Sequence, residues 1–195
     1  ECVFNRSYLV RNGEEIMTAY NLMADEESKK VFKNMCYFEY KGELKYLYAM
    51  ESSKDEAFKI LNLNSEEDYL DLGAYRGDTI DEFLKYTCNR YHSITALEPE
   101  PKTFKKLVEA KGDLENTTLL NKAVWSFDTE LEFRADMGRG SLIKNNGGLL
   151  AETVSIDSLA EDTKFTYIKM DVEGVEFVVL SGGMTLMAEH KPKLN

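Results

Sequence analysis

The sequence predicts an α/β fold: a mainly parallel sheet with helices on both faces, preceded by a small helical segment. From about residue 68, short apolar runs alternate with stretches of helical length, a rhythm typical of parallel sheets. Acidic residues and a glycine-containing turn follow the apolar runs, where such sheets bind ligands. The 195 residues suffice for one domain with a substantial core.

Residues 13–50 are predicted to form helices, because apolar side chains recur there at helical spacing. The first stripe comprises Ile16, Ala19, Tyr20 and Met23, and a second segment opens at Asp25 and carries Val31, Phe32, Met35 and Phe38. We interpret residues 1–64 as a helical preface that packs over one end of a domain at 65–195. A role in gating a substrate is the alternative.

Four strands are predicted within the domain: Tyr69–Leu72, Ser93–Leu97, Thr117–Leu120 and Phe165–Met170. Helices are expected from Thr79 to Tyr86, from Pro101 onward and from near Gly174. Thr79 and Glu82 have the spacing of a capping box, which predicts where the first helix begins. Pro101 suits the first position of the second helix.

The segment between the third and fourth strands breaks this rhythm. Glu130–Phe133 and Thr153–Ile156 are expected to be antiparallel strands. The glycine-rich stretch Gly138–Gly148 between them fits either a mobile loop over a site or a long turn.

Composition excludes several classes of function. The net charge of -11 argues against nucleic acid as a partner, which requires clustered Lys and Arg. Cys2, Cys36 and Cys88 are scattered, as are His92 and His190, so neither a disulfide framework nor a metal site is expected. No apolar run reaches about 18 residues and no signal peptide is visible, so we expect a cytoplasmic protein without a membrane span.

The sharpest motif is the glycine loop from Asp71 to Thr79, between a predicted strand and a predicted helix. Its spacing is DxGxxxG, whereas a dinucleotide fingerprint has GxGxxG and binds a pyrophosphate. An acidic residue before the first glycine repels a pyrophosphate but suits a ligand with an ammonium and a sulfonium group, such as S-adenosyl-L-methionine. An ordinary strand–helix turn is the alternative.

Two further segments carry carboxylates at strand ends. Glu98 is placed to accept ribose hydroxyls, the alternative being a surface glutamate before Pro99. Asp171 and Glu173 follow the fourth strand, where they fit a base for a hydroxyl, ligands for a cation, holders of a ligand's ammonium group, or caps of the helix near Gly174. Asp71, Glu98, Asn121 and Asp171 are expected to converge at one sheet edge.

Together these segments resemble the FkbM-type methyltransferase family over roughly residues 65–195. The motifs are YLDLGAYRGDTIDEFL (69–84), ALEPEPKTFKKL (96–107), LLNKAVWS (119–126), VSIDSL (154–159) and YIKMDVEGVEFVVLSGG (167–183). The stretch at 22–34 also looks like the preface of some bacterial members. The resemblance implies a Rossmann-like class I methyltransferase fold and transfer of a methyl group from S-adenosyl-L-methionine to a hydroxyl of a sugar, glycan or natural product.

The resemblance also assigns residues to the site, none of them as a metal ligand, and metal dependence stays open. The methionine-side loop would comprise Asp71, Gly73, Ala74, Tyr75, Gly77, Asp78 and Thr79. Glu98 and Pro99 would lie at the ribose, Asn121, Lys122 and Ala123 near the adenine, and Asp171 and Glu173 at the transfer site, Asp171 also touching the cofactor. The family normally continues past Asn195 into a further core strand and a closing pair, so we expect a truncated chain.

Two rival functions remain open from the sequence. A nicotinamide-dependent oxidoreductase shares the architecture, but the DxGxxxG spacing and the DVEG segment count against it. The second rival is a non-catalytic module that binds S-adenosyl-L-methionine. The presence of Asp71, Glu98 and Asp171 counts against this rival. The oligomeric state stays open.

Overall fold

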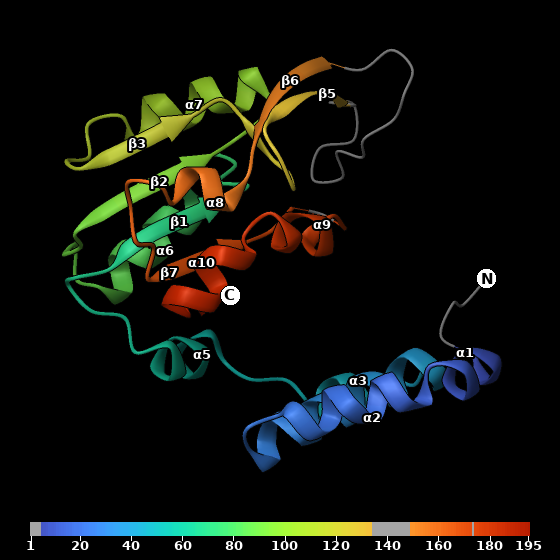
Figure 1. Cartoon of the computed structure of the whole chain (residues 1–195). Coiled ribbons are helices and arrows are strands. Elements are labelled where there is room, and N and C mark those ends of the chain that lie inside the picture. Colours follow the sequence, from blue (N-terminus) through green and yellow to red (C-terminus); the bar gives the residue numbers. More distant parts are fainter. Residues whose placement is uncertain (1–4, 134–148, 173) are drawn as a thin grey trace. The chain divides into compact units, whose positions relative to one another are not determined.

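The computed structural model describes residues 5–133, 149–172 and 174–195. The chain divides into two compact units, Glu1–Ile60 and Leu61–Asn195. Figure 1 labels most of the helices and strands of each unit.

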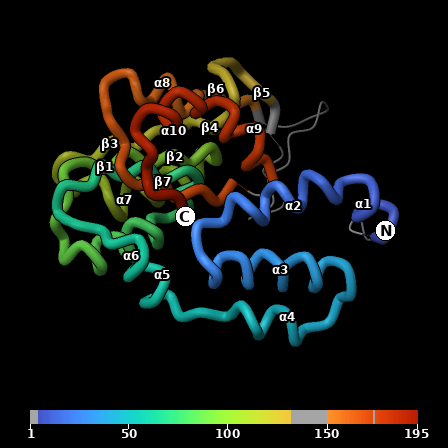
Figure 2. The backbone as a smooth tube through the Cα atoms, turned by 60° about the horizontal axis from the view of Figure 1, so that its bottom comes forward, coloured from blue at the N-terminus to red at the C-terminus, as the bar shows by residue number. Residues whose placement is uncertain are grey.

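The N-terminal unit consists of helices, as predicted for residues 13–50. They are α1 (Arg6–Arg11), α2 (Gly13–Leu22), α3 (Glu26–Lys41), α4 (Lys45–Tyr48) and α5 (Lys54–Leu61), whose last residue belongs to the second unit. The α3 helix is capped at both ends: Asp25 accepts a hydrogen bond from the Ser28 N–H, and Gly42 ends the helix in the left-handed conformation. Figures 1 and 2 show α2 and α3 side by side.

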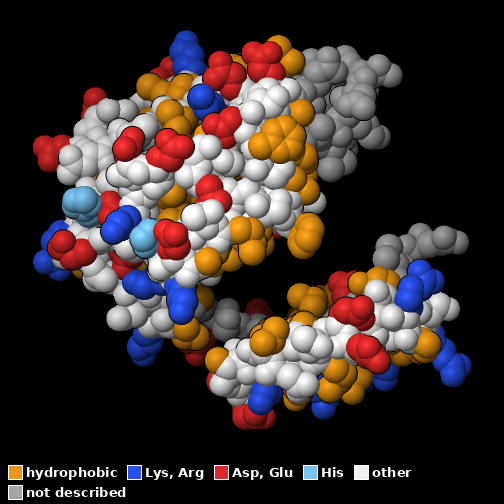
Figure 3. Space-filling model, viewed as in Figure 1, with side chains coloured by type: hydrophobic (Ala, Val, Ile, Leu, Met, Phe, Trp, Pro, Cys, Tyr) orange, Lys and Arg blue, Asp and Glu red, His pale blue; other side chains and the backbone are white. Residues whose placement is uncertain are grey.

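Apolar side chains of α1–α4 are half-buried or exposed. Of the residues described in α1–α4, none is fully buried. Val10, Leu22 and Tyr48 are among the exposed ones, and Figure 3 shows hydrophobic side chains along the visible face of these helices.

The second unit is built on a five-stranded sheet with the order β3-β2-β1-β7-β8. The strands are β1 (Asp68–Leu72), β2 (Ser93–Leu97), β3 (Thr117–Leu120), β7 (Tyr167–Met170) and β8 (Lys193–Leu194), and each neighbouring pair is parallel. This confirms the predicted parallel sheet. Because the chain proceeds outward from β1 to β3 and then returns to the other side of β1, the strand order reverses between β1 and β7.

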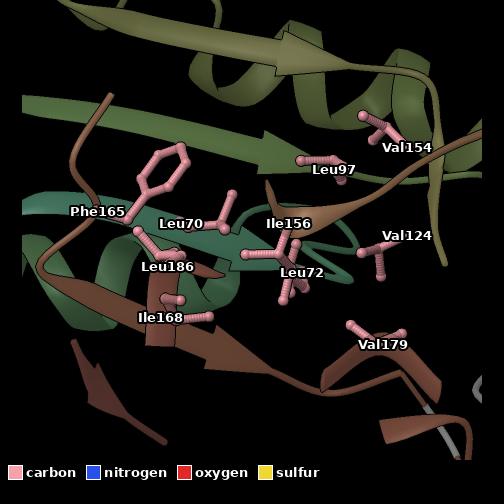
Figure 4. Close-up of a cluster of buried hydrophobic side chains, with 10 residues drawn as sticks. All are labelled: Leu70, Leu72, Leu97, Val124, Val154, Ile156, Phe165, Ile168, Val179 and Leu186. Carbon is pink, nitrogen blue, oxygen red and sulfur yellow. The ribbon is translucent and has the colours of Figure 1, made fainter. Parts of the chain in front are cut away.

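Helices cover both faces of this sheet, as predicted. The helices α6 (Asp78–Tyr86) and α7 (Pro101–Lys111) lie on one face, and α8 (Ile156–Leu159), α9 (Glu176–Ser181) and α10 (Met184–His190) on the other (Figure 1). Strand residues alternate between two cores: Tyr69 and Tyr167 face α6, whereas Leu70 and Ile168 face α10. Figure 4 shows the second core.

The core beside α6 contains an aromatic stack. The ring of Tyr69 lies 4.4 Å from that of Phe83 and 4.9 Å from that of Tyr167, measured between centroids. Because Tyr69 and Tyr167 come from β1 and β7, the stack holds α6 against the two strands that meet at the reversal. Asp71 and Lys169 are the next residues on the same face of these strands.

A buried carboxylate closes the opposite end of the sheet. Glu67 is 1% exposed and accepts hydrogen bonds from the backbone and side chain of Asn64, from Thr166 and from Lys193. It thereby joins the start of β1 to the start of β7 and to β8.

Three helix starts differ from the sequence predictions. Gly77, with φ of 87°, precedes α6 and no side chain caps it, so the predicted capping box is wrong. The Thr79 hydroxyl instead donates a hydrogen bond to the Asp71 carboxylate. The third of the predicted helices corresponds to α9, which begins at Glu176, two residues after the predicted start near Gly174. The α8 helix begins at Ile156, a residue that was predicted to end a strand. Ser155 accepts a bond from the Ser158 N–H at 3.1 Å and so starts α8.

A second, smaller sheet contains β4 (Ala123–Val124), β5 (Thr129–Phe133) and β6 (Leu149–Val154) in the order β4-β6-β5. The β5 and β6 strands are antiparallel, as predicted, but β6 begins at Leu149, four residues before the predicted start at Thr153, and ends at Val154. The predicted loop or turn at Gly138–Gly148 lies outside the described residues. In the main sheet, β7 begins at Tyr167, two residues later than predicted, and Phe165 is buried in the core.

Candidate active site

Four of the predicted polar residues follow adjacent strands at one edge of the main sheet. Asp71 lies on β1, Glu98 directly after β2, Asn121 directly after β3 and Asp171 directly after β7. Since these strands are parallel neighbours, their carboxyl ends meet. The structure therefore brings these residues to the edge at which open parallel sheets bind ligands, next to the reversal of strand order.

The glycine loop between β1 and α6 folds tightly over this edge. The N–H groups of Gly73 and Ala74 both donate to the Leu97 carbonyl, at 3.1 and 2.9 Å. Gly73 has φ of 85°, and a Cβ atom at this position would overlap the backbone oxygen of Asp171. Only glycine allows the loop to lie this close to the end of β7.

Asp71 is the most unusual group of the site. Its side chain is 0% exposed, and one oxygen, Oδ2, accepts the hydroxyl proton of Thr79. The other oxygen, Oδ1, accepts no hydrogen bond from any described residue; we call it the open Asp71 oxygen. Burial raises the pKa of Asp71, while the Lys169 charge and hydrogen bonds from Thr79 and Tyr69 oppose this shift.

Lys169 places a positive charge between the two strand ends. Its Nζ atom lies 3.7 Å from Asp71 Oδ1 and 3.7 Å from Asp171 Oδ2, and it donates to the Gly73 carbonyl at 3.4 Å. The lysine side chain is 11% exposed, whereas that of Asp171 is 67% exposed. The positive charge of Lys169 thus compensates the negative charges of Asp71 and Asp171 at the end of β7.

Lys169 was not among the site residues predicted from the sequence. The signal that could have identified it is positional. Lys169 stands two residues before Asp171, so both side chains project from the same face of the strand. The register pairs Lys169 with Asp71, which places all three on that face.

Glu98 is held by backbone donors. Its Oε1 atom accepts from the Glu100 N–H at 2.9 Å, and Oε2 accepts from the Tyr75 N–H at 3.0 Å. The residue is 8% exposed, so the alternative of a surface glutamate is wrong. Burial raises the pKa of Glu98, and the two backbone bonds oppose this shift. Asn121 donates to the carbonyls of Glu98 and Pro99.

The remaining predicted residues surround this centre. Tyr75 is 37% exposed, and the Arg76 guanidinium lies over its ring at 5.0 Å. Asp78 is exposed in the first turn of α6, and Ala123 is buried in β4. Lys122 forms a 3.0 Å ion pair with Glu152.

The residues after β7 give a partial test of the predicted capping role. Glu173 lies outside the described residues. Among the described residues no side chain caps the start of α9, so the predicted capping by Asp171 is wrong. Gly174 instead donates its N–H to Glu176.

Two other kinds of site are absent from the described residues. Within residues 5–133, 149–172 and 174–195, no three His, Cys, Asp or Glu side chains are grouped so that they could hold a metal ion. In the same ranges, no helix combines the length and the hydrophobicity that crossing a bilayer requires.

The motif that carries much of the family resemblance has a structural role. The carboxylate of Asp157 accepts the N–H groups of Thr185 and Leu186 at 3.1 and 2.9 Å, and so caps α10. Its own N–H donates to the Gly182 carbonyl at 2.8 Å. A Cβ atom on Gly182 would lie 2.7 Å from the Trp125 carbonyl. These contacts fasten α8 to α10, the helices that follow β6 and β7.

Comparison with known proteins decides the family. A family model described as the methyltransferase FkbM domain matches residues 71–194. The chain belongs to the FkbM methyltransferase family. The matched range begins at Asp71 and includes the described strands and loops that form the candidate site of the FkbM domain.

A solved structure with a similar fold is the methyltransferase FkbM from Methylobacillus flagellatus KT, with a TM-score of 0.77 and 21% sequence identity. The match covers 96% of this chain and 48% of that one, so the chain spans about half the length of that structure. This likeness confirms the predicted α/β fold of the FkbM domain. No curated protein matches the chain.

Proposed function

We propose that the FkbM domain binds S-adenosyl-L-methionine and transfers its methyl group to a hydroxyl of a sugar, glycan or natural-product acceptor. The observation that carries this proposal is the open Asp71 oxygen. It belongs to a fully buried carboxylate at the reversal of strand order, beneath a loop that only glycine allows. A buried carboxylate oxygen without a donor is costly unless a ligand supplies one.

The side chains at this edge fit the parts of that cofactor. Its ammonium group would donate to Asp71, and Glu98, oriented by Tyr75 and Glu100, would accept the ribose hydroxyls. Asn121, Lys122 and Ala123, at the end of β3 and the start of β4, would lie near the adenine. When bound, the cofactor supplies a methyl group made electrophilic by its sulfonium. A pyrophosphate is disfavoured here, because Asp71 and Asp171 would repel it.

Asp171 is the candidate base. Its carboxylate is 67% exposed, so it can reach an acceptor that enters from solvent, and its Oδ2 atom lies 3.7 Å from the Lys169 ammonium group. It would accept the proton of the attacking hydroxyl, a role typically worth about 10²–10⁴-fold in rate. Glu173, two residues further along the chain, stays a predicted second carboxylate of the transfer site.

The first test is thermal unfolding with S-adenosylhomocysteine, with NAD as the control ligand. A ligand at 100 times its Kd stabilises by about 2.7 kcal/mol, which raises the Tm of a domain of this size by roughly 5–10 °C. We expect this shift with S-adenosylhomocysteine only. A shift with NAD only would replace the proposal by an oxidoreductase.

The second test addresses the acceptor hydroxyl. Transfer of a labelled methyl group to a panel of sugars and hydroxylated natural products should identify a substrate. With that substrate, Asp171→Asn should lower kcat by about 10²-fold or more and leave the Kd of S-adenosylhomocysteine within a few-fold. An equal loss of binding and turnover would instead place Asp171 on the cofactor.

A further inference from the structure

Lys169 stands where two carboxylates and a loop carbonyl meet. Asp71 and Asp171 each lie 3.7 Å from its Nζ atom, and its hydrogen bond goes to the Gly73 carbonyl. A distance of 3.7 Å is too long for a hydrogen bond but short enough for strong Coulomb attraction at a buried position. Lys169 therefore stabilises the charge of Asp71 without occupying the open Asp71 oxygen.

The surroundings of Asp71 make this charge necessary. A fully buried carboxyl favours its neutral form, and a protonated carboxyl is a poor acceptor for an ammonium group. The titratable groups that act on Asp71, or feel its charge, come from three strands and a helix. They are Tyr69 on β1, Glu98 after β2, Tyr167, Lys169 and Asp171 on or after β7, and Asp78 on α6. Lys169 is the single cation in this set of described residues.

We propose that Lys169 is a positioning residue: its ammonium group bridges Asp71, Asp171 and the Gly73 carbonyl, and so keeps the open Asp71 oxygen charged and oriented to receive the ammonium group of the cofactor. This inference rests on the proposed cofactor. It adds a residue that acts through the two carboxylates and does not itself react. It also explains why the strand before Asp171 carries a lysine in its interior.

The first measurement needs no cofactor. The carboxyl carbon of Asp71 is titrated by NMR in wild type, in Lys169→Met, which removes the charge at similar length, and in Lys169→Arg, which keeps it. The Asp71 midpoint should rise by about one to three pH units in Lys169→Met and stay near the wild-type value in Lys169→Arg. Equal midpoints in all three proteins would overturn the proposal.

The second measurement is the Kd of S-adenosylhomocysteine as a function of pH. Binding requires ionised Asp71, so a higher Asp71 midpoint weakens binding most at acid pH, by up to about tenfold for each pH unit by which the midpoint rises. The loss in Lys169→Met should shrink as the pH rises, and Lys169→Arg should largely restore binding. A loss of the same size at every pH would indicate a merely structural role.

Two controls keep the outcomes distinct. If Lys169→Met folds poorly, its stability is compared in the Asp71→Asn background. Lys169→Met should cost less stability in the Asp71→Asn background than in wild type, because the Asp71 charge that Lys169 compensates is gone, and an equal cost in both backgrounds would overturn the proposal. Wild type that fails to bind S-adenosylhomocysteine overturns the proposed function together with this inference. Wild type that binds, with unchanged Asp71 midpoints in the variants, overturns the inference alone.

Discussion

Asp71 and Glu98 are buried carboxylates at the ends of neighbouring strands, but they are held in opposite ways. Both oxygens of Glu98 accept backbone N–H groups from the loops around it. Asp71 accepts hydrogen bonds from the side chains of Thr79 and Tyr69, lies 3.7 Å from the Lys169 ammonium group and leaves Oδ1 open. Burial raises the pKa of each carboxyl. Glu98 is therefore oriented by the folded chain, whereas Asp71 keeps a free acceptor oxygen to which a cationic ligand can donate a hydrogen bond.

Glu67, at the other end of the sheet, sharpens this contrast. It is as buried as Asp71, but it accepts hydrogen bonds from Asn64, Thr166 and Lys193. A buried carboxylate whose oxygens all accept hydrogen bonds from the same chain stabilises the folded state. A buried carboxylate with a free oxygen costs folding stability but can bind a cationic ligand. Substitutions should separate these two uses, beginning with the largest effect.

Gly73→Ala should abolish binding of S-adenosylhomocysteine, with more than about 100-fold loss of affinity, because the added methyl group displaces the loop from the Asp171 carbonyl. The matched control is Gly42→Ala, which has a φ of 68° and no atom within 4 Å of the added methyl. It should lose only the about 1–2 kcal/mol of a left-handed non-glycine residue. Calorimetry and urea unfolding measure both, and equal behaviour of the two variants would refute the close-approach explanation.

Asp71→Asn should weaken binding of S-adenosylhomocysteine by about 10- to 100-fold and stabilise the free protein at neutral pH. The pKa of Asp71 in the folded protein lies above its ordinary value of 3.8. Between pH 3.8 and this raised pKa, the native state therefore binds more protons than the unfolded state. Wild-type stability therefore falls as pH rises through this window. The advantage of the variant in Tm should grow with pH and vanish near pH 4.

Glu67→Gln is the matched control for Asp71→Asn. It should destabilise the fold by about 1–3 kcal/mol, because it breaks a buried, charge-assisted network, and leave the affinity for S-adenosylhomocysteine unchanged. Loss of stability in both variants would mean that Asp71, too, serves the fold.

Glu98→Gln should lower both stability and affinity. The amide offers one acceptor oxygen to two N–H groups, those of Tyr75 and Glu100, so one is left unsatisfied at about 1–3 kcal/mol. We expect about tenfold weaker binding of S-adenosylhomocysteine. Unfolding in urea and calorimetry at one pH suffice. A variant that is more stable than wild type would erase the contrast with Asp71.

Thr79→Val should have the smallest effect. Removing the donor to Asp71 raises the pKa of the carboxyl and weakens binding by about fivefold, most at acid pH. Thr79→Ser keeps the hydroxyl and should bind as wild type does. If Thr79→Val instead reduces helix content without changing affinity, Thr79 serves as a cap after all.

The architecture was predictable because its signals are local and repeated. Apolar runs at Tyr69–Leu72, Ser93–Leu97 and Thr117–Leu120 are short and separated by helical stretches, so strand type and parallel order follow. The meeting of Asp71, Glu98, Asn121 and Asp171 followed from the same rule, since every parallel strand ends at one edge.

The errors arose where one local signal competed with another interaction of the same segment. The Thr79–Glu82 spacing fits a capping box, but the hydroxyl bonds to Asp71, a strand residue eight positions earlier. Ile156 continues an apolar run, yet Ser155 caps a helix at that point. The role of Lys169 depends on its register with Asp71, which no single segment contains.

The open Asp71 oxygen also couples binding to the proton balance of the solution. A cation that docks against a carboxyl near its titration midpoint must displace a proton, so each binding event releases a fraction of a proton to the buffer. The heat measured by calorimetry then contains the protonation enthalpy of the buffer, and it should differ between phosphate and Tris at the same pH. The slope of that difference counts the protons that Asp71 releases when the cofactor arrives.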